Sequence, residues 1–192
     1  MFIVDKLLKP LRYIQISNNE KRWFDLWLPI TFAVLVTVLL YLLPKPISFL
    51  GKDSIVSLTN GILQILSGFY IASMAAVATF NRDGMDDPMA GGDCPRLDGQ
   101  KLTRRGFLSY LFGYLAFTSI LMYFAGGLCQ LMLESLRELF RDYPWIKMVG
   151  SFLYLTALFN IIFTTVLGMH FLIDRIHRSE PHLYDNNKQD KE

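Results

Sequence analysis

Four long apolar runs, none of which contains Asp, Glu, Lys or Arg, alternate with polar stretches along this chain. Each run holds between 19 and 28 residues, and about 20 apolar residues in a helix span the hydrocarbon core of a bilayer. Because no water reaches that core, a spanning segment must satisfy its own backbone hydrogen bonds, as an α-helix does. The pattern therefore predicts an all-α, polytopic membrane protein with four transmembrane helices. The runs are Leu26–Pro44, Ser54–Asn81, Gly106–Leu133 and Met148–Ile173.

The four runs leave little sequence for a separate soluble domain. We expect a transmembrane domain over residues 23–178, preceded by a basic segment (1–22) and followed by a disordered tail (179–192). Within the domain the spans are expected at about 26–44, 54–81, 106–133 and 148–173, and a long loop (81–105) joins the second span to the third. Pro29 is expected in the first turn of its helix, where a missing N–H is harmless.

Lys and Arg residues are distributed unevenly among the polar stretches. The segment before the first run, the loop 81–105 and the segment after the fourth run together carry 14, and the other two loops carry 5. Cytoplasmic segments of membrane proteins carry an excess of Lys and Arg. This distribution predicts that both termini and the loop 81–105 lie in the cytoplasm (N-in/C-in).

Two segments outside the runs have apolar residues at helical spacing. The first is the basic N-terminal segment, predicted either as an amphipathic helix on the anionic inner leaflet or as a tail packed on the cytoplasmic ends of the spans. The second, Leu128–Asp142, predicts that the third helix extends beyond the membrane, or bends at Gly126-Gly127 and lies along the outer surface. Its apolar face needs lipid, another span or a second subunit as partner. The N-terminal apolar positions are Ile3, Leu7, Leu11 and Ile14, and the outer ones include Leu128, Leu131, Leu136 and Leu139.

Small and polar residues recur every three or four positions within three of the runs. In lipid such stripes let helices approach closely and form hydrogen bonds to each other, so packing within the bundle or between subunits is the favoured interpretation. A pore lined by Asn60, Gln64 and Asn160 is the alternative. The charge-free runs lack the carboxylates that many transporters use for proton or ion coupling. The candidates for helix packing or a pore are Asn60, Gln64, Gly68, Ala72, Gly113, Asn160 and Thr164.

The loop 81–105 carries five Asp and five basic residues, together with Gly and Pro residues that exclude a long helix. It lacks the alternating ligands of an EF-hand. Mixed charges on a loop of this length favour either a segment that binds a cytosolic protein or a solvated connector. The partner-binding candidates are Asp83, Asp86, Asp87, Arg96, Arg104 and Arg105.

His170, Asp174 and His177 have the spacing i, i+4 and i+7, which places them on one face of the fourth helix. They could share a divalent metal or sense pH, or they could pair with neighbouring Arg residues and lipid headgroups. The chain has no phosphate-binding loop, nucleotide-binding glycine pattern or nucleophile elbow. We therefore expect no enzymatic activity, no cofactor and no direct contact with nucleic acid.

The segment Phe69–Phe80, the Asp/Gly/Pro-rich loop and the segment Leu102–Tyr114 together form one predicted cytoplasmic hairpin. A small four-span chain with such a hairpin resembles KwaA, the membrane subunit of the Kiwa anti-phage defence system. The resemblance covers the whole chain in layout but rests on span count and size, without a motif matched residue by residue. It implies a homo-oligomer of the bacterial inner membrane that senses phage attack and anchors a cytosolic DNA-binding effector.

These features together predict a non-catalytic membrane scaffold or sensor that forms homo-oligomers, a tetramer being favoured. It would recruit a cytosolic partner through the loop 81–105 and the termini. An oligomeric pore that depolarises the membrane is the first alternative, and a small integral-membrane enzyme is the second.

Overall fold

The computed structural model describes residues 6, 8–16, 19–44, 47–79, 85–87 and 95–177, without the side chains of 19, 20 and 174–177. The described chain is mostly helical, and four of its helices are long and apolar enough to cross a membrane. The predicted α-helical class and the four long apolar helices are therefore confirmed. The four spans are Trp23–Leu42, Ile55–Thr79, Arg104–Leu131 and Pro144–Ile173.

The first long helix consists of three consecutive pieces, α2 (Asn19–Arg22), a π-helical turn η2 (Trp23–Trp27) and α3 (Leu28–Leu42). Pro29 explains the π-helical turn. Proline has no N–H for the carbonyl four residues earlier, and its ring crowds that carbonyl, which here belongs to Asp25. Pro29 lies in the first turn of α3, as expected. The π-helical turn and α2 continue the helix before it, so the missing N–H leaves the Asp25 carbonyl without its usual donor.

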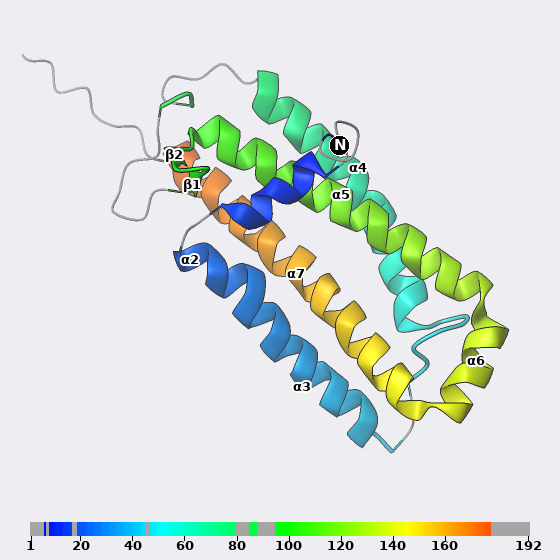
Figure 1. Ribbon diagram of the computed structural model, residues 1–192. Helices are drawn as coiled ribbons and strands as arrows, with labels where there is room; N and C mark the ends of the chain where they lie inside the picture. Colours follow the sequence, from blue (N-terminus) through cyan, green and yellow to red (C-terminus); the bar gives the residue numbers. More distant parts are fainter. Residues whose placement is uncertain are drawn as a thin grey trace, which may run out of the picture.

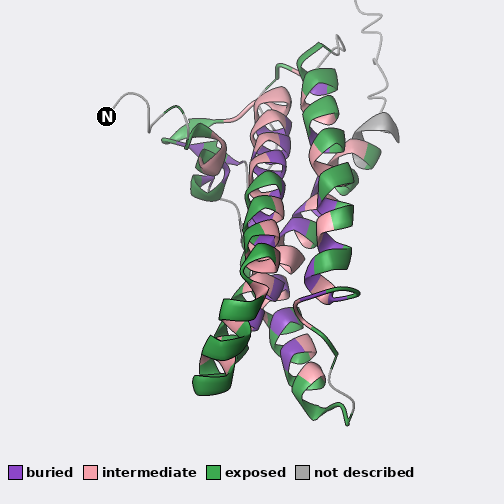
Figure 2. Cartoon of the chain, turned by 90° about the vertical axis from the view of Figure 1, so that its right-hand side faces the viewer, coloured by how far each residue is buried: buried purple, intermediate pink, exposed green. Residues whose placement is uncertain are grey.

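The four long helices lie side by side in the order α3, α7, α5, α4 (Figure 1). Helix α4 (Ile55–Thr79) packs along α5 (Arg104–Leu131), and α3 packs along α7 (Pro144–His177). Contacts between α5 and α7 join the two pairs. Buried residues lie on the inward faces of these helices and exposed residues on their outward faces (Figure 2). Many of the exposed residues are large and apolar.

The third span leads into a separate short helix. Helix α5 continues through Gly126-Gly127 and ends at Leu131, and α6 (Leu133–Asp142) begins after Met132. The predicted bend at the two glycines therefore lies five residues further on, at Met132. The end of α5 is fixed by Gln130, which accepts a hydrogen bond from the Gly51 N–H (3.2 Å) and donates one to Ser54 Oγ (3.3 Å).

The opposite end of the bundle, where α2 begins and α7 ends, is called the terminal end below. It carries a β-hairpin, β1 (Arg96–Leu97) paired antiparallel with β2 (Gln100–Lys101). Both residues of its turn, Asp98 and Gly99, have positive φ (51° and 80°), as a type I′ hairpin turn requires.

A short 3₁₀ helix, η1 (Lys9–Gln15), lies across α5 near the terminal end (Figure 1). The Tyr13 ring is fully buried and stacks on Tyr114, with ring centroids 4.9 Å apart. Of the two interpretations of the N-terminal segment, its described part thus adopts the one in which it packs on the spans. Ile3 and Leu7 lie outside the described residues.

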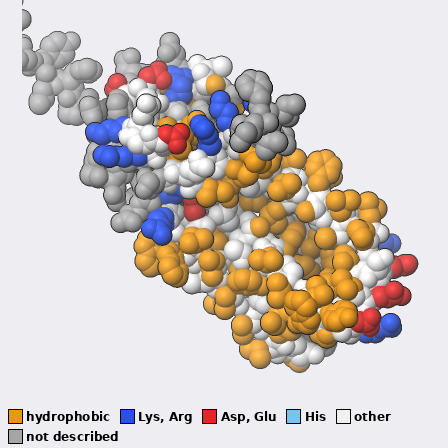
Figure 3. Space-filling model, in the orientation of Figure 1, with side chains coloured by type: hydrophobic (Ala, Val, Ile, Leu, Met, Phe, Trp, Pro, Cys, Tyr) orange, Lys and Arg blue, Asp and Glu red, His pale blue; other side chains and the backbone are white. Residues whose placement is uncertain are grey.

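Charged side chains gather at the two ends of the molecule, and apolar side chains cover the middle (Figure 3). This distribution matches a bundle that lies across a bilayer, because charged groups at the depth of the hydrocarbon are costly.

Candidate functional site

A buried ion pair lies inside the bundle near the terminal end. Lys21 Nζ lies 3.1 Å from Asp25 Oδ2, and the two side chains are only 6% and 16% exposed. The residues are four positions apart, so they lie on the same face of the first helix. Asp25 belongs to the first span. An ionisable side chain within a span faces the protein interior and has a partner there, and Asp25 follows this rule.

The Asp25 carboxylate also joins two other segments. Thr164 Oγ1, on α7, donates a hydrogen bond to Asp25 Oδ1 (3.0 Å), and the Tyr13 hydroxyl, on η1, donates to the same oxygen (3.3 Å). Both carboxylate oxygens therefore have partners. One side chain holds the N-terminal segment, the first helix and the fourth helix together.

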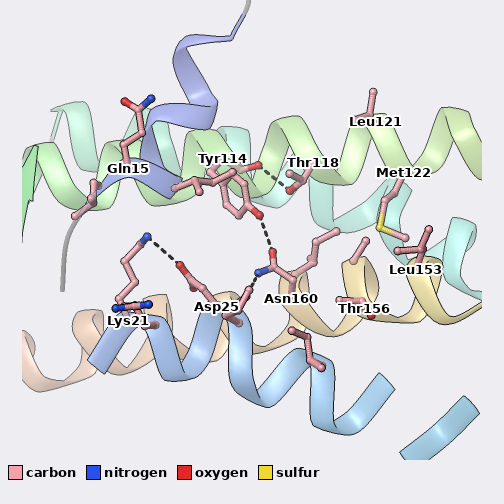
Figure 4. A pocket seen from close by; sticks show the side chains of 17 residues that line it. Gln15, Lys21, Asp25, Tyr114, Thr118, Leu121, Met122, Leu153, Thr156 and Asn160 are labelled. Carbon is pink, nitrogen blue, oxygen red and sulfur yellow. Dashed lines mark hydrogen bonds and ion pairs between the residues drawn. The ribbon is translucent and has the colours of Figure 1, made fainter. Parts of the chain in front are cut away.

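The backbone carbonyl of Asp25 has a partner for a different reason. Pro29 cannot donate to it, and Asn160 Nδ2 on α7 donates instead (2.7 Å). Asn160 Oδ1 accepts a hydrogen bond from the Tyr114 hydroxyl on α5 (2.7 Å). The proline thus makes a backbone acceptor available, and the asparagine uses it to connect η2, α7 and α5 (Figure 4). We call Tyr13, Lys21, Asp25, Tyr114, Asn160 and Thr164 the polar network.

Burial shifts the two titratable groups of the network that lie outside the spans. It lowers the pKa of the Lys21 ammonium, against the opposing effect of Asp25. Burial, together with the nearby Asp25 charge, raises the pKa of the Tyr13 hydroxyl. The Lys21 ammonium also lies 4.2 Å from the centroid of the Tyr13 ring, a position in which the ring attracts a cation.

The network borders a cavity of about 730 Å³ between η1, the first helix, α5 and α7 (Figure 4). We call this space the crevice. Its end near the terminal end is lined by Gln15, Lys21, Arg22 and Asp25, and its other end by Leu121, Met122 and Leu153. Its volume lies within the range of ligand sites, roughly 300–1,000 Å³.

The centre of this site, Asp25, was not among the residues predicted from the sequence. The prediction was that no charge lies in the core of any span; the first span begins at Trp23, and Asp25 is its third residue. The charge-free run begins one residue later, at Leu26, and so hid the carboxylate. Two signals could have revealed it: Lys21 lies four residues before Asp25, and Pro29 lies four residues after it.

Two of the predicted packing residues, Asn160 and Thr164, are members of the network. Two others serve the α4–α5 contact: a Cβ at Gly113 would lie 3.6 Å from Met74 Sδ, and Asn60 Nδ2 donates to the Tyr123 carbonyl (3.4 Å). Gln64, Gly68 and Ala72 are exposed on the outward face of α4. Of the three residues of the predicted pore, Asn60 faces α5, Gln64 is exposed one turn further along α4, and Asn160 lies in the polar network. The pore stays a prediction.

Two of the loop candidates form a clamp at the terminal end. Arg105 binds the Asp86 carboxylate through Nε (2.7 Å) and Nη2 (3.1 Å). Its Nη1 donates to the carbonyls of Val77 (3.1 Å) and Ala78 (3.0 Å), which end α4. Asp87 and Arg96 are exposed and Arg104 is half-buried. Asp83 lies outside the described residues.

The predicted metal or pH-sensing cluster is described only in part. His170 is exposed, and its ring centroid lies 6.1 Å from that of Phe171. The side chains of Asp174 and His177 lie outside the described residues, so this prediction stays untested. Among the residues that are described, no three His, Cys, Asp or Glu side chains come together as metal ligands would.

Comparison of the chain with protein-family models, with curated proteins and with solved structures found no match.

Proposed function

We propose that this protein is a non-catalytic membrane scaffold or sensor that presents a structured cap to a cytosolic protein partner. The cap comprises η1, residues 85–87 and residues 95–103. The observation that supports this most directly is the Arg105 clamp, because it holds residues 85–87 against the ends of α4 and α5. A loop that is held in this way presents its exposed charges in a fixed arrangement, which lowers the entropy lost when a partner binds.

Further contacts join the parts of the cap. The Arg105 N–H donates to the Met85 carbonyl (3.0 Å), and the Leu102 N–H donates to the Pro95 carbonyl (3.0 Å). An ion pair links Arg12 of η1 to Asp98 in the hairpin turn (3.7 Å). Leu97 is buried in the same apolar cluster as Tyr13. These contacts join η1, residues 85–87 and the β-hairpin to one another at the terminal end.

The charge distribution supports a cytoplasmic position for the cap, with both termini on that side of the membrane. The three segments at the terminal end carry 14 of the 19 Lys and Arg residues, as the positive-inside rule requires. A bacterial inner membrane and a role in anti-phage defence stay predictions, since they rest only on the resemblance to the Kiwa membrane subunit.

Helix α5 supports a sensing role because it contacts the cap, the polar network and the loop before α4. Arg105 binds the cap at one end, Tyr114 joins the polar network, and Gln130 binds the loop before α4 at the other end. A shift of α6 on the outer side would move α5 and reach the cap along one continuous helix.

The outward face of α4 supports the proposed homo-oligomer. Gly68 and Ala72 leave room for a second helix there, since a Cβ at Gly68 would meet no described atom within 4 Å. Gln64 lies on the same face, and its amide has no hydrogen-bond partner among the described residues. In hydrocarbon such an amide gains a partner when two subunits associate.

Co-purification from native membranes in a mild detergent tests the recruitment. We expect Arg96→Glu combined with Lys101→Glu, both exposed on the hairpin, to abolish capture of the protein that the wild type retains. Arg137→Glu combined with Arg141→Glu, exposed on α6, makes the same charge change at the other end and should leave capture intact. Equal capture by both double variants would contradict the proposal.

A further inference from the structure

The crevice lies at the depth of the membrane, and no described residue fills it. Its lining comes from η1, the first helix, α5 and α7 (Figure 4). Helix α3 packs mainly along α7, and α5 packs mainly along α4, so α3 and α5 diverge on either side of α7. An unfilled space of about 730 Å³ between spans exposes apolar side chains that must contact something other than water.

The polarity of the crevice changes along the membrane normal. Near the terminal end it is lined by Gln15, Lys21 and Arg22, and towards the bundle centre by Leu121, Met122 and Leu153. Leu121 and Leu153 are each 60% exposed within this chain. A molecule that fits this gradient has a polar head at the membrane surface and an apolar chain that reaches toward the midplane.

The wall of the crevice offers no free polar group to the inner part of such a molecule. The hydroxyls of Thr118 and Thr156 donate to carbonyls one turn earlier, those of Tyr114 (2.8 Å) and Phe152 (2.8 Å). Asn160 uses its amide within the polar network. Because these groups are already satisfied, the inner crevice is suited to a hydrocarbon chain rather than to a polar solute.

The mouth of the crevice differs from the wall because the described residues that line it carry a net positive charge. Lys21 is paired with Asp25, so Arg22 sets the net charge of the lining at +1. The Arg22 side chain is exposed and has no partner among the described residues. Basic pockets between transmembrane helices on the cytoplasmic side bind anionic lipid headgroups, and a guanidinium binds phosphate through two parallel hydrogen bonds.

We infer that the crevice is a binding site for one anionic phospholipid of the leaflet at the terminal end. Arg22 binds its phosphate group, and one acyl chain lies against Leu26, Leu121 and Leu153. The bound lipid fills the space between α3 and α5 and covers the polar network from the membrane side. This site exists whether or not a partner binds the cap.

Native mass spectrometry of the purified full chain tests the site, with dioleoyl phosphatidylglycerol and dioleoyl phosphatidylcholine as competing probes. We expect the wild type to retain one phosphatidylglycerol in preference to phosphatidylcholine. Arg22→Gln should lower this retention about fivefold, the effect of one basic group near an anionic lipid. Leu121→Trp and Leu153→Trp, on two different helices, should each remove the bound lipid by filling the crevice.

Matched controls separate the crevice from the rest of the surface. Arg137→Gln removes an exposed charge at the other end, and Leu58→Trp enlarges an outward side chain that is 69% exposed on α4; both should retain lipid as the wild type does. Unfolding temperatures of all variants establish that each is folded. Equal retention of the two lipids, or full retention by both Trp variants, would overturn the inference. A third result would also overturn it: the wild type retains no lipid, and the Trp variants have a different subunit number from the wild type. A second copy of the chain, rather than a lipid, would then fill the crevice.

Discussion

Two stripes with the same spacing in sequence have opposite places in the structure. On α7, Asn160, Thr164 and Gly168 recur every four residues and face the interior, where the first two bind Asp25. On α4, Gln64, Gly68 and Ala72 have the same spacing and lie on the outward face. Spacing therefore shows that residues share a helix face, but does not show whether that face meets the same chain, another subunit or lipid.

The difference arises because small or polar residues are tolerated on any face of a helix in lipid that packs against another helix. The α7 stripe has its partner within the chain, since Pro29 makes the Asp25 carbonyl available to Asn160. The α4 stripe is turned away from α5, which instead contacts the buried face formed by Val56, Leu63, Tyr70 and Val77. The inward stripe should govern folding of the single chain, and the outward stripe should govern assembly.

Asp25→Ala is expected to have the largest effect on folding. It leaves the Lys21 ammonium buried without its carboxylate and removes the acceptor of Thr164 and Tyr13. Breaking a buried pair in this way lowers the free energy of unfolding by about 3–5 kcal/mol, measurable by denaturant titration in detergent micelles. The double variant Lys21→Met with Asp25→Leu should recover most of this loss, and a single variant as stable as the wild type would contradict a structural role.

Tyr13→Phe tests the inward network through its pH dependence. The raised pKa of the folded-state hydroxyl means that its contribution is complete below the ordinary tyrosine pKa of about 10 and is lost as the pH rises above it. The wild type should lose up to about 1.4 kcal/mol of stability per pH unit from this group between pH 10 and 11, and the variant should lack that slope. Tyr143→Phe, at an exposed tyrosine, is the control, and parallel curves for the wild type and Tyr13→Phe would exclude the effect.

Gly168→Ala examines the inward stripe by packing. A Cβ there would lie 2.9 Å from Leu111 Cδ2, and Leu111 is fully buried. Overpacking of this kind costs about 1–3 kcal/mol, of which the better helix propensity of alanine offsets up to about 1. Thermal unfolding in detergent should show a net destabilisation of about 1 kcal/mol, and an increase in stability would show that Leu111 moves freely.

Gly68→Ala makes the same chemical change on the outward stripe and should have the smallest effect, with the opposite sign. With open space at Gly68, only the helix propensity acts, and the free energy of unfolding of the single chain should rise by about 0.5–1 kcal/mol. The subunit number, measured by light scattering or native mass spectrometry, should fall because the close approach of a second helix is blocked. Unchanged assembly in both Gly68→Ala and Gln64→Leu would remove this face from the proposed interface.

Particular residues show which features of the fold and the site could be predicted from the sequence. The charge-free runs located the four spans to within a few residues at most ends, because length and hydropathy suffice for this. They placed the start of the first span at Leu26 rather than at Trp23, because the sequence does not distinguish a buried Lys21–Asp25 pair from two surface charges. Asp86 and Arg105 were both candidates, but their contact joins residues 19 positions apart and depends on how the loop folds back.

The sequence by itself determined the four helices that are long and apolar enough to cross a membrane and the basic excess of three of the segments that flank them. The cost of placing peptide and charged groups in hydrocarbon acts on each segment separately. The tertiary structure alone decided which charge is buried, which small-residue stripe faces inward and where the crevice lies. Those outcomes depend on contacts between helices that are distant in sequence. One example is the Asp25 carbonyl, which Pro29 leaves without its donor and which Asn160 of α7 binds.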